Sequence, residues 1–208
     1  FKKISILIPV YNEQTTIKLI IKKFLVANIF NLNLEIVVVD DCSTDKTWDV
    51  IKMISKKHDC IVSKIHSTNK GKGAALRTAI KSATGHVLLI QDADLEYDPK
   101  DYPNLLSPIL NHHADVVYGS RFRTNYETRV LYFWHRLANG LLTLFSNMFT
   151  NLNLTDMETG YKVFRKDIIF QIKLCENRFG IEPEITAKIA KIPNIRIYEV
   201  GISYFGRT

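Results

Sequence analysis

Short apolar runs alternate with helical patterns along the first 120 residues of the chain. The continuous apolar runs predict buried strands over residues 3–10, 34–39, 61–66, 87–90 and 114–118. Between the first two runs, Ile17, Ile20 and Phe24 recur at helical spacing and predict a helix over residues 13–27. Because strands that alternate with helices build parallel β-α-β units, the pattern predicts an α/β fold with a mostly parallel central sheet flanked by helices.

The last 80 residues have a different character. Residues 130–150 carry a heavy apolar face that includes Trp134, Leu141 and Phe145, and they predict an amphipathic helix. Two interpretations stay open: the helix faces the core, or residues 129–150 lie at a membrane interface or beside an acceptor. A loop and strand over residues 156–165, a helix over 182–191 and a strand over 195–204 complete the predicted elements.

The composition narrows the class of protein. A chain of 208 residues with 46% hydrophobic content is sized for one domain, over residues 1–208, with a substantial core. The 28 Lys and Arg against 21 Asp and Glu give a net charge of +7, which favours nucleotides, lipid phosphates, an anionic membrane or nucleic acid as partners. No signal peptide and no apolar run of about 18 residues is present, so no spanning helix is predicted. Three cysteines without metal-type spacing indicate a reducing compartment.

An acidic stretch follows the strand predicted over residues 87–90. Asp92, Asp94 and Glu96 stand at alternate positions, so an extended backbone would present three carboxylates on one side. Such close like charges repel unless a cation lies among them, and carboxylate oxygens suit Mg²⁺ or Mn²⁺. The stretch therefore predicts a divalent metal site. Its alternative is a solvated acidic turn.

Other polar motifs also follow predicted strands, where open α/β sheets bind their ligands. They are Pro9, Tyr11 and Glu13 at the exit of the first strand, Asp40 and Asp41 after the second, and residues 69–73 after the third. Ordinary packing is the alternative role for Tyr11, and helix capping is the alternative for Asp40 and Asp41. Lysine and glycine before a helix make an anion site credible, from which we select Lys70, and a plain loop fits equally well.

The ordered set of motifs resembles a known family. Residues 8–13 (Ile-Pro-Val-Tyr-Asn-Glu), 39–45 (Val-Asp-Asp-Cys-Ser-Thr-Asp) and 92–94 (Asp-Ala-Asp) look like the inverting family-2 glycosyltransferases of the GT-A fold. Residues 92–96, 119–121, 156–164 and 201–207 are similar to one branch, the dolichol- and polyprenyl-phosphate sugar synthases. The resemblance spans nearly the whole chain. It implies the GT-A nucleotide-diphospho-sugar transferase fold for residues 1–208.

The resemblance also implies a donor site. In that family the nucleoside lies at the exit of the first strand, where Glu13 would accept from ribose hydroxyls and Tyr11 would pack on the base beside Pro9. One of Asp40 and Asp41 would accept from a base N–H, and Val39 would offer backbone groups. The nucleotide sugar would further contact Lys70 and residues Asp92, Ala93 and Asp94. Asp94 is implied as the chief metal ligand, while relatives often carry glutamine at the position of Glu96.

Arginines are implied on the acceptor side. Arg121, one of Arg129 and Arg136, and Arg207 would surround the diphosphate and the incoming lipid phosphate, because a guanidinium forks onto phosphate oxygens. A surface role is the alternative for Arg121. A phosphate acceptor is already ionised at neutral pH and needs no general base. Asp156 and Glu158 mark where relatives with hydroxyl acceptors place a base, and here Asp156 is expected to order the site. Asp92, Asp94, Arg121 and Arg207 are the expected catalytic residues.

Together these features predict a metal-dependent, inverting hexosyltransferase. The expected donor is GDP-mannose first and UDP-glucose second, the acceptor is dolichyl or polyprenyl phosphate, and no nucleic acid partner is expected. The enzyme would act at the cytoplasmic face of a membrane, with an acceptor lid or membrane anchor beyond this chain. Two alternatives remain: a family-2 transferase that acts on a saccharide hydroxyl, and a catalytically silent module that binds nucleotide sugars.

Overall fold

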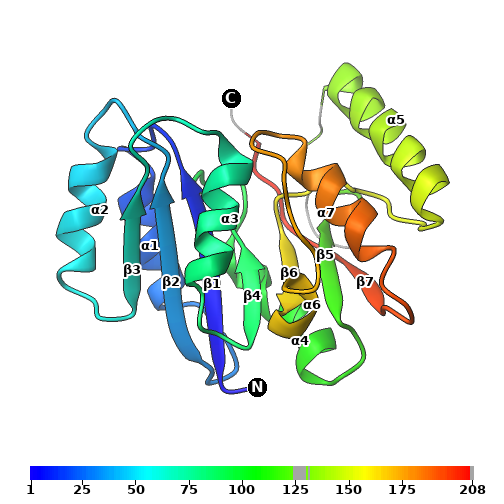
Figure 1. Cartoon of the computed structure of the whole chain (residues 1–208), viewed down its shortest axis with the longest axis horizontal. Coiled ribbons are helices and arrows are strands. Elements are labelled where there is room, and N and C mark those ends of the chain that lie inside the picture. The colour runs from blue at the N-terminus through cyan, green and yellow to red at the C-terminus, as the bar shows by residue number, and fades with distance from the viewer. Residues whose placement is uncertain (124–129, 131, 207–208) are drawn as a thin grey trace.

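A computed structural model describes residues 1–123, 130 and 132–206, and its centre is one sheet of seven strands (Figure 1). The strand order is β3-β2-β1-β4-β6-β5-β7. The strands are β1 (Lys3–Val10), β2 (Asn33–Asp40), β3 (Ile61–Ile65), β4 (Val87–Ile90), β5 (Val116–Ser120), β6 (Lys162–Arg165) and β7 (Ile197–Gly201). Within the described residues only β6 runs antiparallel to its neighbours. The predicted α/β class with a mostly parallel sheet is confirmed.

Helices cover both faces of this sheet. They are α1 (Ile17–Leu25), α2 (Thr47–Ser55), α3 (Lys72–Ser82), the short 3₁₀ helix η1 (Pro99–Asp101), α4 (Tyr102–Leu110), α5 (Phe133–Thr150), α6 (Lys166–Ile169) and α7 (Ile181–Ile189). Apolar residues of α1, α2 and α4 pack on one face, and those of α3, α6 and α7 pack on the other. Because both faces are covered, the inner strands are apolar at nearly every position, which explains their continuous apolar runs.

Several boundaries differ from the prediction. The helix predicted over residues 13–27 begins only at Ile17, because Asn12 has a positive φ of 55° and residues 13–16 form a turn first. The strand predicted over residues 114–118 is shifted by two residues, to β5. The closing strand predicted over residues 195–204 is shorter, and Tyr204 forms only an isolated antiparallel bridge with Tyr97, outside the sheet strands.

The sheet has two parts, which we name by their strand directions. The parallel part consists of β3, β2, β1 and β4 with helices α1, α2 and α3. The mixed part consists of β6, β5 and β7 with helices α4, α5, α6 and α7. Figure 1 shows the parallel part on the left of the molecule and the mixed part on the right.

Helix α5 packs little against the rest of the described chain. Figure 1 shows it projecting at the upper right, outside the layers that cover the sheet. Of its 18 residues only Thr143 is buried. Trp134 is 73% exposed and Phe149 is 88% exposed. The interpretation that this helix faces the core is therefore wrong. In the part of the chain that the structure describes, no helix is both long and apolar enough to cross a bilayer.

Candidate functional site

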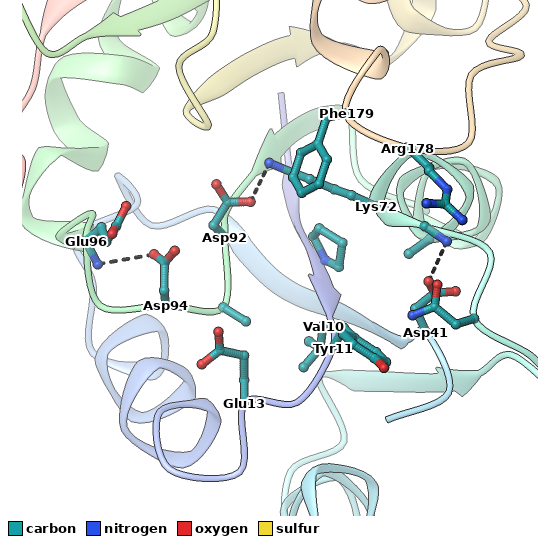
Figure 2. Close-up of a pocket in the computed structure, with 15 residues that line it drawn as sticks. Val10, Tyr11, Glu13, Asp41, Lys72, Asp92, Asp94, Glu96, Arg178 and Phe179 are labelled. Atoms are coloured by element: carbon teal, nitrogen blue, oxygen red, sulfur yellow. Dashed lines mark hydrogen bonds and ion pairs between the residues drawn. The ribbon is translucent and has the colours of Figure 1, made fainter. Parts of the chain in front are cut away.

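A pocket of about 490 Å³ opens at the carboxyl ends of β1, β2 and β4 (Figure 2). Parallel strands deliver their following loops to the same sheet edge, so residues that are far apart in sequence meet there. The pocket is lined by Pro9, Val10, Tyr11, Glu13, Asp41, Asn69, Gly71, Lys72, Ala75, Asp92, Ala93, Asp94, Glu96, Arg178 and Phe179. Seven of the residues selected from the sequence as donor contacts thus share one cavity: Pro9, Tyr11, Glu13, Asp41, Asp92, Ala93 and Asp94.

Asp92 is held in place from two sides. Its Oδ1 lies 2.8 Å from Lys72 Nζ. Its Oδ2 lies so close to Gly160 that a Cβ at that position would collide with it. The Gly160 N–H donates to the hydroxyl of Tyr97, which fixes the glycine against the acidic stretch. Gly160 is therefore a site residue that the sequence prediction missed, and any side chain there would displace Asp92.

The three carboxylates of the acidic stretch do not form the expected trio. The backbone N–H of Glu96 donates to Asp94 Oδ1 at 3.2 Å, which closes a tight turn and ends the extended conformation that we assumed. The Glu96 side chain accepts a 2.9 Å hydrogen bond from the hydroxyl of Tyr204. Among the described residues, no group of three or more His, Cys, Asp or Glu is arranged to hold a metal ion. The described side chains are therefore not gathered in advance as a three-carboxylate site, and the metal role of Asp92, Asp94 and Glu96 stays a prediction.

Two of these carboxylates nevertheless suit a divalent ion that takes some of its ligands from the protein and the others from a substrate. Asp92 and Asp94 both line the pocket, and both are partly exposed to it (Figure 2). Mg²⁺ commonly binds through one or two carboxylates and completes its shell with water and substrate phosphates. Oxygen donors of this kind also suit Mn²⁺. The residues present therefore suit a metal that arrives with a diphosphate.

Lys72 is the cation of this wall, and it replaces Lys70 in that role. Lys72 is the first residue of α3, and its Nζ lies between Asp92 and Glu182 Oε1, the latter at 3.1 Å. Lys70 does not line the pocket; its side chain is exposed and its N–H is bound by Asp41. This geometry does not support Lys70 as a pocket contact, because the direction in which each lysine points depends on where α3 begins. The pattern Lys-Gly-Lys held the signal for both residues.

Asp41 closes the opposite end of the pocket. Its carboxylate accepts hydrogen bonds from the N–H groups of Lys70 and Gly71, the latter at 2.6 Å, and lies 2.6 Å from His66 Nδ1. These contacts fix the loop before α3 against the end of β2. Asp41 thus has a structural role in this loop as well as a place in the pocket wall.

Val39 and Asp40 do not reach the pocket. Val39 is fully buried and is paired with β1 on one side and β3 on the other, so its backbone groups are used by the sheet. Asp40 is also fully buried, and its Oδ1 accepts from Ser43, which is the capping role considered as its alternative. Burial raises the pKa of Asp40. The predicted contacts of Val39 and Asp40 with a base are not supported by this geometry.

A loop from the mixed part completes the pocket. Ala74 N–H donates to the carbonyl of Asn177, and the Arg77 guanidinium donates to the carbonyls of Cys175 and Glu176. A Cβ at Gly71 or at Gly73 would collide with this loop, so these glycines permit its close approach.

This anchored loop brings Arg178 and Phe179 to the pocket rim, across from Glu13 in Figure 2. Within the described residues the Arg178 guanidinium has no hydrogen-bond or ion-pair partner. No sequence pattern pointed to either residue, because their loop meets α3 only in the folded chain.

Arg121 lies apart from this pocket and is tied to Asp156. Its Nε donates to Asp156 Oδ2 and its Nη2 donates to Asp156 Oδ1, both at 2.7 Å. Burial alone would lower the pKa of Arg121, but the bonds to the fully buried Asp156 outweigh it and raise that pKa. Asp156 therefore orders an arginine, which agrees with the role expected for it.

The remaining arginines are only partly described. Arg136, in the first turn of α5, lies with its guanidinium 5.3 Å from the centre of the Phe122 ring, and Arg121 lies 5.6 Å from the same ring. The structure thus brings both Arg121 and Arg136 to the ring of one aromatic residue. Arg129 and Arg207 fall outside the described residues, so their predicted phosphate contacts stay predictions.

Comparisons with known proteins agree with this architecture. The family model for glycosyl transferase family 2 matches residues 5–172. A dolichol-phosphate mannosyltransferase of Pyrococcus furiosus is 30% identical over 188 residues, covering 89% of this chain and 53% of the relative. A dodecaprenyl-phosphate galacturonate synthase of Rhizobium johnstonii is 25% identical over 207 residues, covering 99% of this chain and 60% of the relative. The chain thus spans between half and three-fifths of the length of these relatives.

Solved structures show the same fold at lower identity. Mycobacterium tuberculosis glucosyl-3-phosphoglycerate synthase, in a complex described with Mn²⁺, uridine diphosphate and phosphoglyceric acid, superposes with a TM-score of 0.75 at 17% identity. That match covers 100% of this chain and 72% of the other. The structure of TarS from S. aureus superposes with a TM-score of 0.70 at 24% identity, covering 95% of this chain and 58% of the other. With its pocket at the carboxyl ends of a mostly parallel sheet, the chain has the GT-A fold and belongs to glycosyl transferase family 2.

Proposed function

We propose that this chain transfers a hexose from a nucleotide sugar to a dolichyl or polyprenyl phosphate, with residues 1–208 acting as one catalytic domain. The observation that carries the proposal is the pocket wall on which Asp92, Asp94 and Lys72 lie together, at the sheet edge where such folds bind nucleotides. Support for the acceptor comes from relatives whose names specify dolichol phosphate and dodecaprenyl phosphate.

The donor would lie along the pocket. Tyr11 is 46% exposed and offers a ring face to the base, while Glu13 lines the same wall and can accept from a ribose hydroxyl. The diphosphate would then extend toward Asp92 and Asp94. These two carboxylates would hold Mg²⁺ or Mn²⁺, which acts as a Lewis acid on the diphosphate oxygens when bound.

Lys72 supplies a fixed positive charge at the same place. During transfer, the bond between the anomeric carbon and the donor diphosphate breaks, and its electron pair stays on the diphosphate. Lys72 Nζ is already positioned at the pocket wall, so it stabilises this developing charge without first being ordered. Interactions that strengthen as the charge develops lower the barrier instead of only tightening binding.

The acceptor would approach from the side of Arg121. One of its phosphate oxygens forms the new bond to the anomeric carbon on the face opposite the leaving diphosphate, which inverts the configuration. No proton has to be removed, because a phosphate monoester is ionised at neutral pH. Arg121 and Arg136, gathered at Phe122, would offset the repulsion between two phosphates, and Asp156 would keep Arg121 in place.

GDP-mannose is the first choice of donor, supported by the relative named as a mannosyltransferase. UDP-glucose is the second choice. The pocket residues Tyr11 and Asp41 do not by themselves separate a guanine from a uracil, because the carboxylate of Asp41 is already engaged by the loop before α3.

Helix α5 would bring the protein to the cytoplasmic face of a membrane. Its exposed residues include Trp134, Leu141, Phe145 and Phe149, and its sequence contains no acidic residue. A helix that is apolar and aromatic on its outer surface, with Arg136 at its start, suits the headgroup region of an anionic bilayer. Because Arg136 and Arg121 both contact the Phe122 ring, a lipid phosphate at that surface would meet the arginines of the site.

A transfer assay with two donors and two acceptors tests the proposal. The protein, with Mn²⁺, is incubated with labelled GDP-mannose or UDP-glucose and with either polyprenyl phosphate in vesicles or a panel of oligosaccharides. We expect labelled polyprenyl phosphate sugar. Labelled product only with oligosaccharides would favour a transferase that acts on saccharide hydroxyls, and tight donor binding without any product would favour a silent binding module.

A further inference from the structure

Four charged side chains of alternating sign run from the core to the pocket wall. Lys162 Nζ lies 2.5 Å from Glu182 Oε2, Glu182 Oε1 lies 3.1 Å from Lys72 Nζ, and Lys72 Nζ lies 2.8 Å from Asp92 Oδ1. The residues come from β6, α7, α3 and the loop after β4. Only the last pair borders the pocket; Lys162 and Glu182 lie behind it.

The two inner side chains of this row, those of Lys162 and Glu182, are unusually buried for charged groups. The side chain of Lys162 is 0% exposed and that of Glu182 is 4% exposed, against 19% for Lys72. Ionised groups lose several kcal/mol of hydration when they are buried, so an apolar pair would commonly be at least as stable. Stability of the fold alone is therefore a weak reason for this pair.

Glu182 is held from inside the protein. Lys162 Nζ also donates to the carbonyl of Thr159 and lies 5.2 Å from the centre of the Tyr118 ring. The hydroxyl of Tyr118 is bonded to Thr186, one turn beyond Glu182 in α7. Because these contacts fix both the lysine and the helix, the Glu182 carboxylate cannot follow Lys72 if that side chain moves toward the pocket.

The two partners of Lys72 differ in this respect. Asp92 lies in the pocket wall with a 22% exposed side chain. In the proposed reaction its oxygens would bind the divalent metal. If Asp92 were the only partner of Lys72, engaging it elsewhere would leave the ammonium without an anchor. Glu182 remains with Lys72 in either case.

We propose that Glu182 is a positioning residue that holds the Lys72 ammonium at the pocket wall for the diphosphate of the donor. Lys162 serves this purpose by keeping Glu182 ionised and fixed. The inference rests on the proposed function, in which Lys72 faces the diphosphate. It adds that the strength of this contact is set by a carboxylate that touches neither donor nor acceptor.

A double-mutant cycle tests this. Binding of GDP and of UDP, each with Mn²⁺, is measured by calorimetry for the wild-type protein, Glu182→Gln, Lys72→Ala and the combination of both. We expect Lys72→Ala to weaken binding about thirtyfold and Glu182→Gln to weaken it about tenfold. In the Lys72→Ala background, Glu182→Gln should have almost no further effect, because Glu182 acts through the lysine.

Glu35→Gln provides a matched control. Glu35 is also a buried carboxylate paired with a lysine, Lys3, but that pair lies at the amino ends of β1 and β2, away from the pocket. It should leave nucleotide binding unchanged. In the transfer assay, Glu182→Gln should raise the KM for the donor and leave the KM for the acceptor unchanged, a separation that a general loss of structure would not produce.

The outcomes separate the inference from the proposed function. An equal loss on Glu182→Gln with and without Lys72, or no loss at all, would overturn the inference while donor binding stands. Absence of GDP and UDP binding by the wild-type protein would overturn both. If Glu182→Gln does not fold, the paired change Lys162→Met with Glu182→Gln, which removes the whole buried pair, takes its place in the cycle under the same criteria.

Discussion

The parallel part and the mixed part use their side chains in opposite ways. In the parallel part the apolar residues are buried between layers, and most of the polar residues of the pocket project from the loops at one sheet edge. The mixed part buries ion pairs, such as Arg121 with Asp156 and Lys162 with Glu182, and leaves the apolar helix α5 exposed. The first part is suited to hold a polar small molecule, and the second presents a surface suited to an apolar acceptor.

Removing the charge of Asp94 should have the largest effect. Asp94→Asn keeps the size of the side chain but removes a carboxylate from the part of the pocket where the diphosphate of the donor would lie. We expect the rate of sugar transfer to fall about a thousandfold, or about 4 kcal/mol of transition-state stabilisation. Single-turnover transfer of labelled sugar measures this.

Asp49→Asn is the matched control for that change, because Asp49 is an exposed residue of α2 in the same part of the molecule. It should leave the rate unchanged. Full transfer by Asp94→Asn, or by the wild-type protein in excess chelator, would show that the carboxylates of the parallel part do not serve the reaction through a metal.

Glu35 tests whether a buried charge in the parallel part supports only the fold. Burial alone would raise its pKa, but hydrogen bonds from Lys3, Ser5 and Thr84 outweigh burial and hold the pKa at about 2, below the ordinary 4.5. The folded state therefore gains stability above pH 4.5 and loses it as the pH falls toward 2. Glu35→Gln should lower the free energy of unfolding by about 3 kcal/mol at pH 7.

Urea unfolding at several pH values checks this prediction. The difference between wild type and Glu35→Gln should shrink steadily between pH 4.5 and pH 2, while transfer activity at pH 7 stays the same for both. A difference that does not depend on pH would mean that the carboxylate of Glu35 is not ionised in the way the contacts indicate.

A change at Arg121 tests how much a buried ion pair of the mixed part contributes to stability and to transfer activity. Arg121→Lys keeps the positive charge but loses the two-pronged contact with Asp156, because an ammonium cannot fork. We expect the free energy of unfolding to fall by about 2 kcal/mol, together with a loss of transfer activity. Arg196→Lys removes a similar fork from Asp115, but the Arg196 side chain is 46% exposed, so this change should alter stability much less. If both changes lowered the free energy of unfolding equally, burial of the pair Arg121–Asp156 would not be what makes its contact strong.

Helix α5 should show the smallest effect, and only at membranes. Trp134→Ser with Phe145→Ser removes two exposed side chains, so the urea midpoint should not change. Sedimentation with anionic vesicles should show binding about tenfold weaker, or about 1.4 kcal/mol. Leu19→Ser with Val26→Ser, two exposed apolar residues of the parallel part, is the control and should leave vesicle binding unchanged. Equal vesicle binding by all three proteins would remove α5 from the membrane proposal.

The same division explains what could be predicted from the sequence. In the parallel part, continuous apolar runs define the strands, and each polar motif follows its strand, so Tyr11, Glu13, Asp41, Asp92 and Asp94 could be placed together in advance. Local rules are sufficient there because each β-α unit is built from neighbouring residues.

The rest depended on contacts between distant segments. The choice between Lys70 and Lys72 depends on where α3 begins, and the contact between Gly160 and Asp92 joins residues 68 positions apart. Glu182, Arg178 and Phe179 reach the site from α7 and the loop before it. The periodicity of α5 showed an apolar face but not whether the core would cover it. Pattern alone cannot supply such information, because it resides in the packing of one segment against another.

The central claim is that Asp92, Asp94 and Lys72 together receive the diphosphate of a nucleotide sugar. A crystal of the protein soaked with Mn²⁺ and GDP-mannose, and a second one with UDP-glucose, tests it most directly. We predict that at least one donor lies in the pocket, with the metal on Asp94 and the diphosphate within hydrogen-bond distance of Lys72 Nζ. A donor bound elsewhere, or a diphosphate that contacts none of these three side chains, would contradict the account.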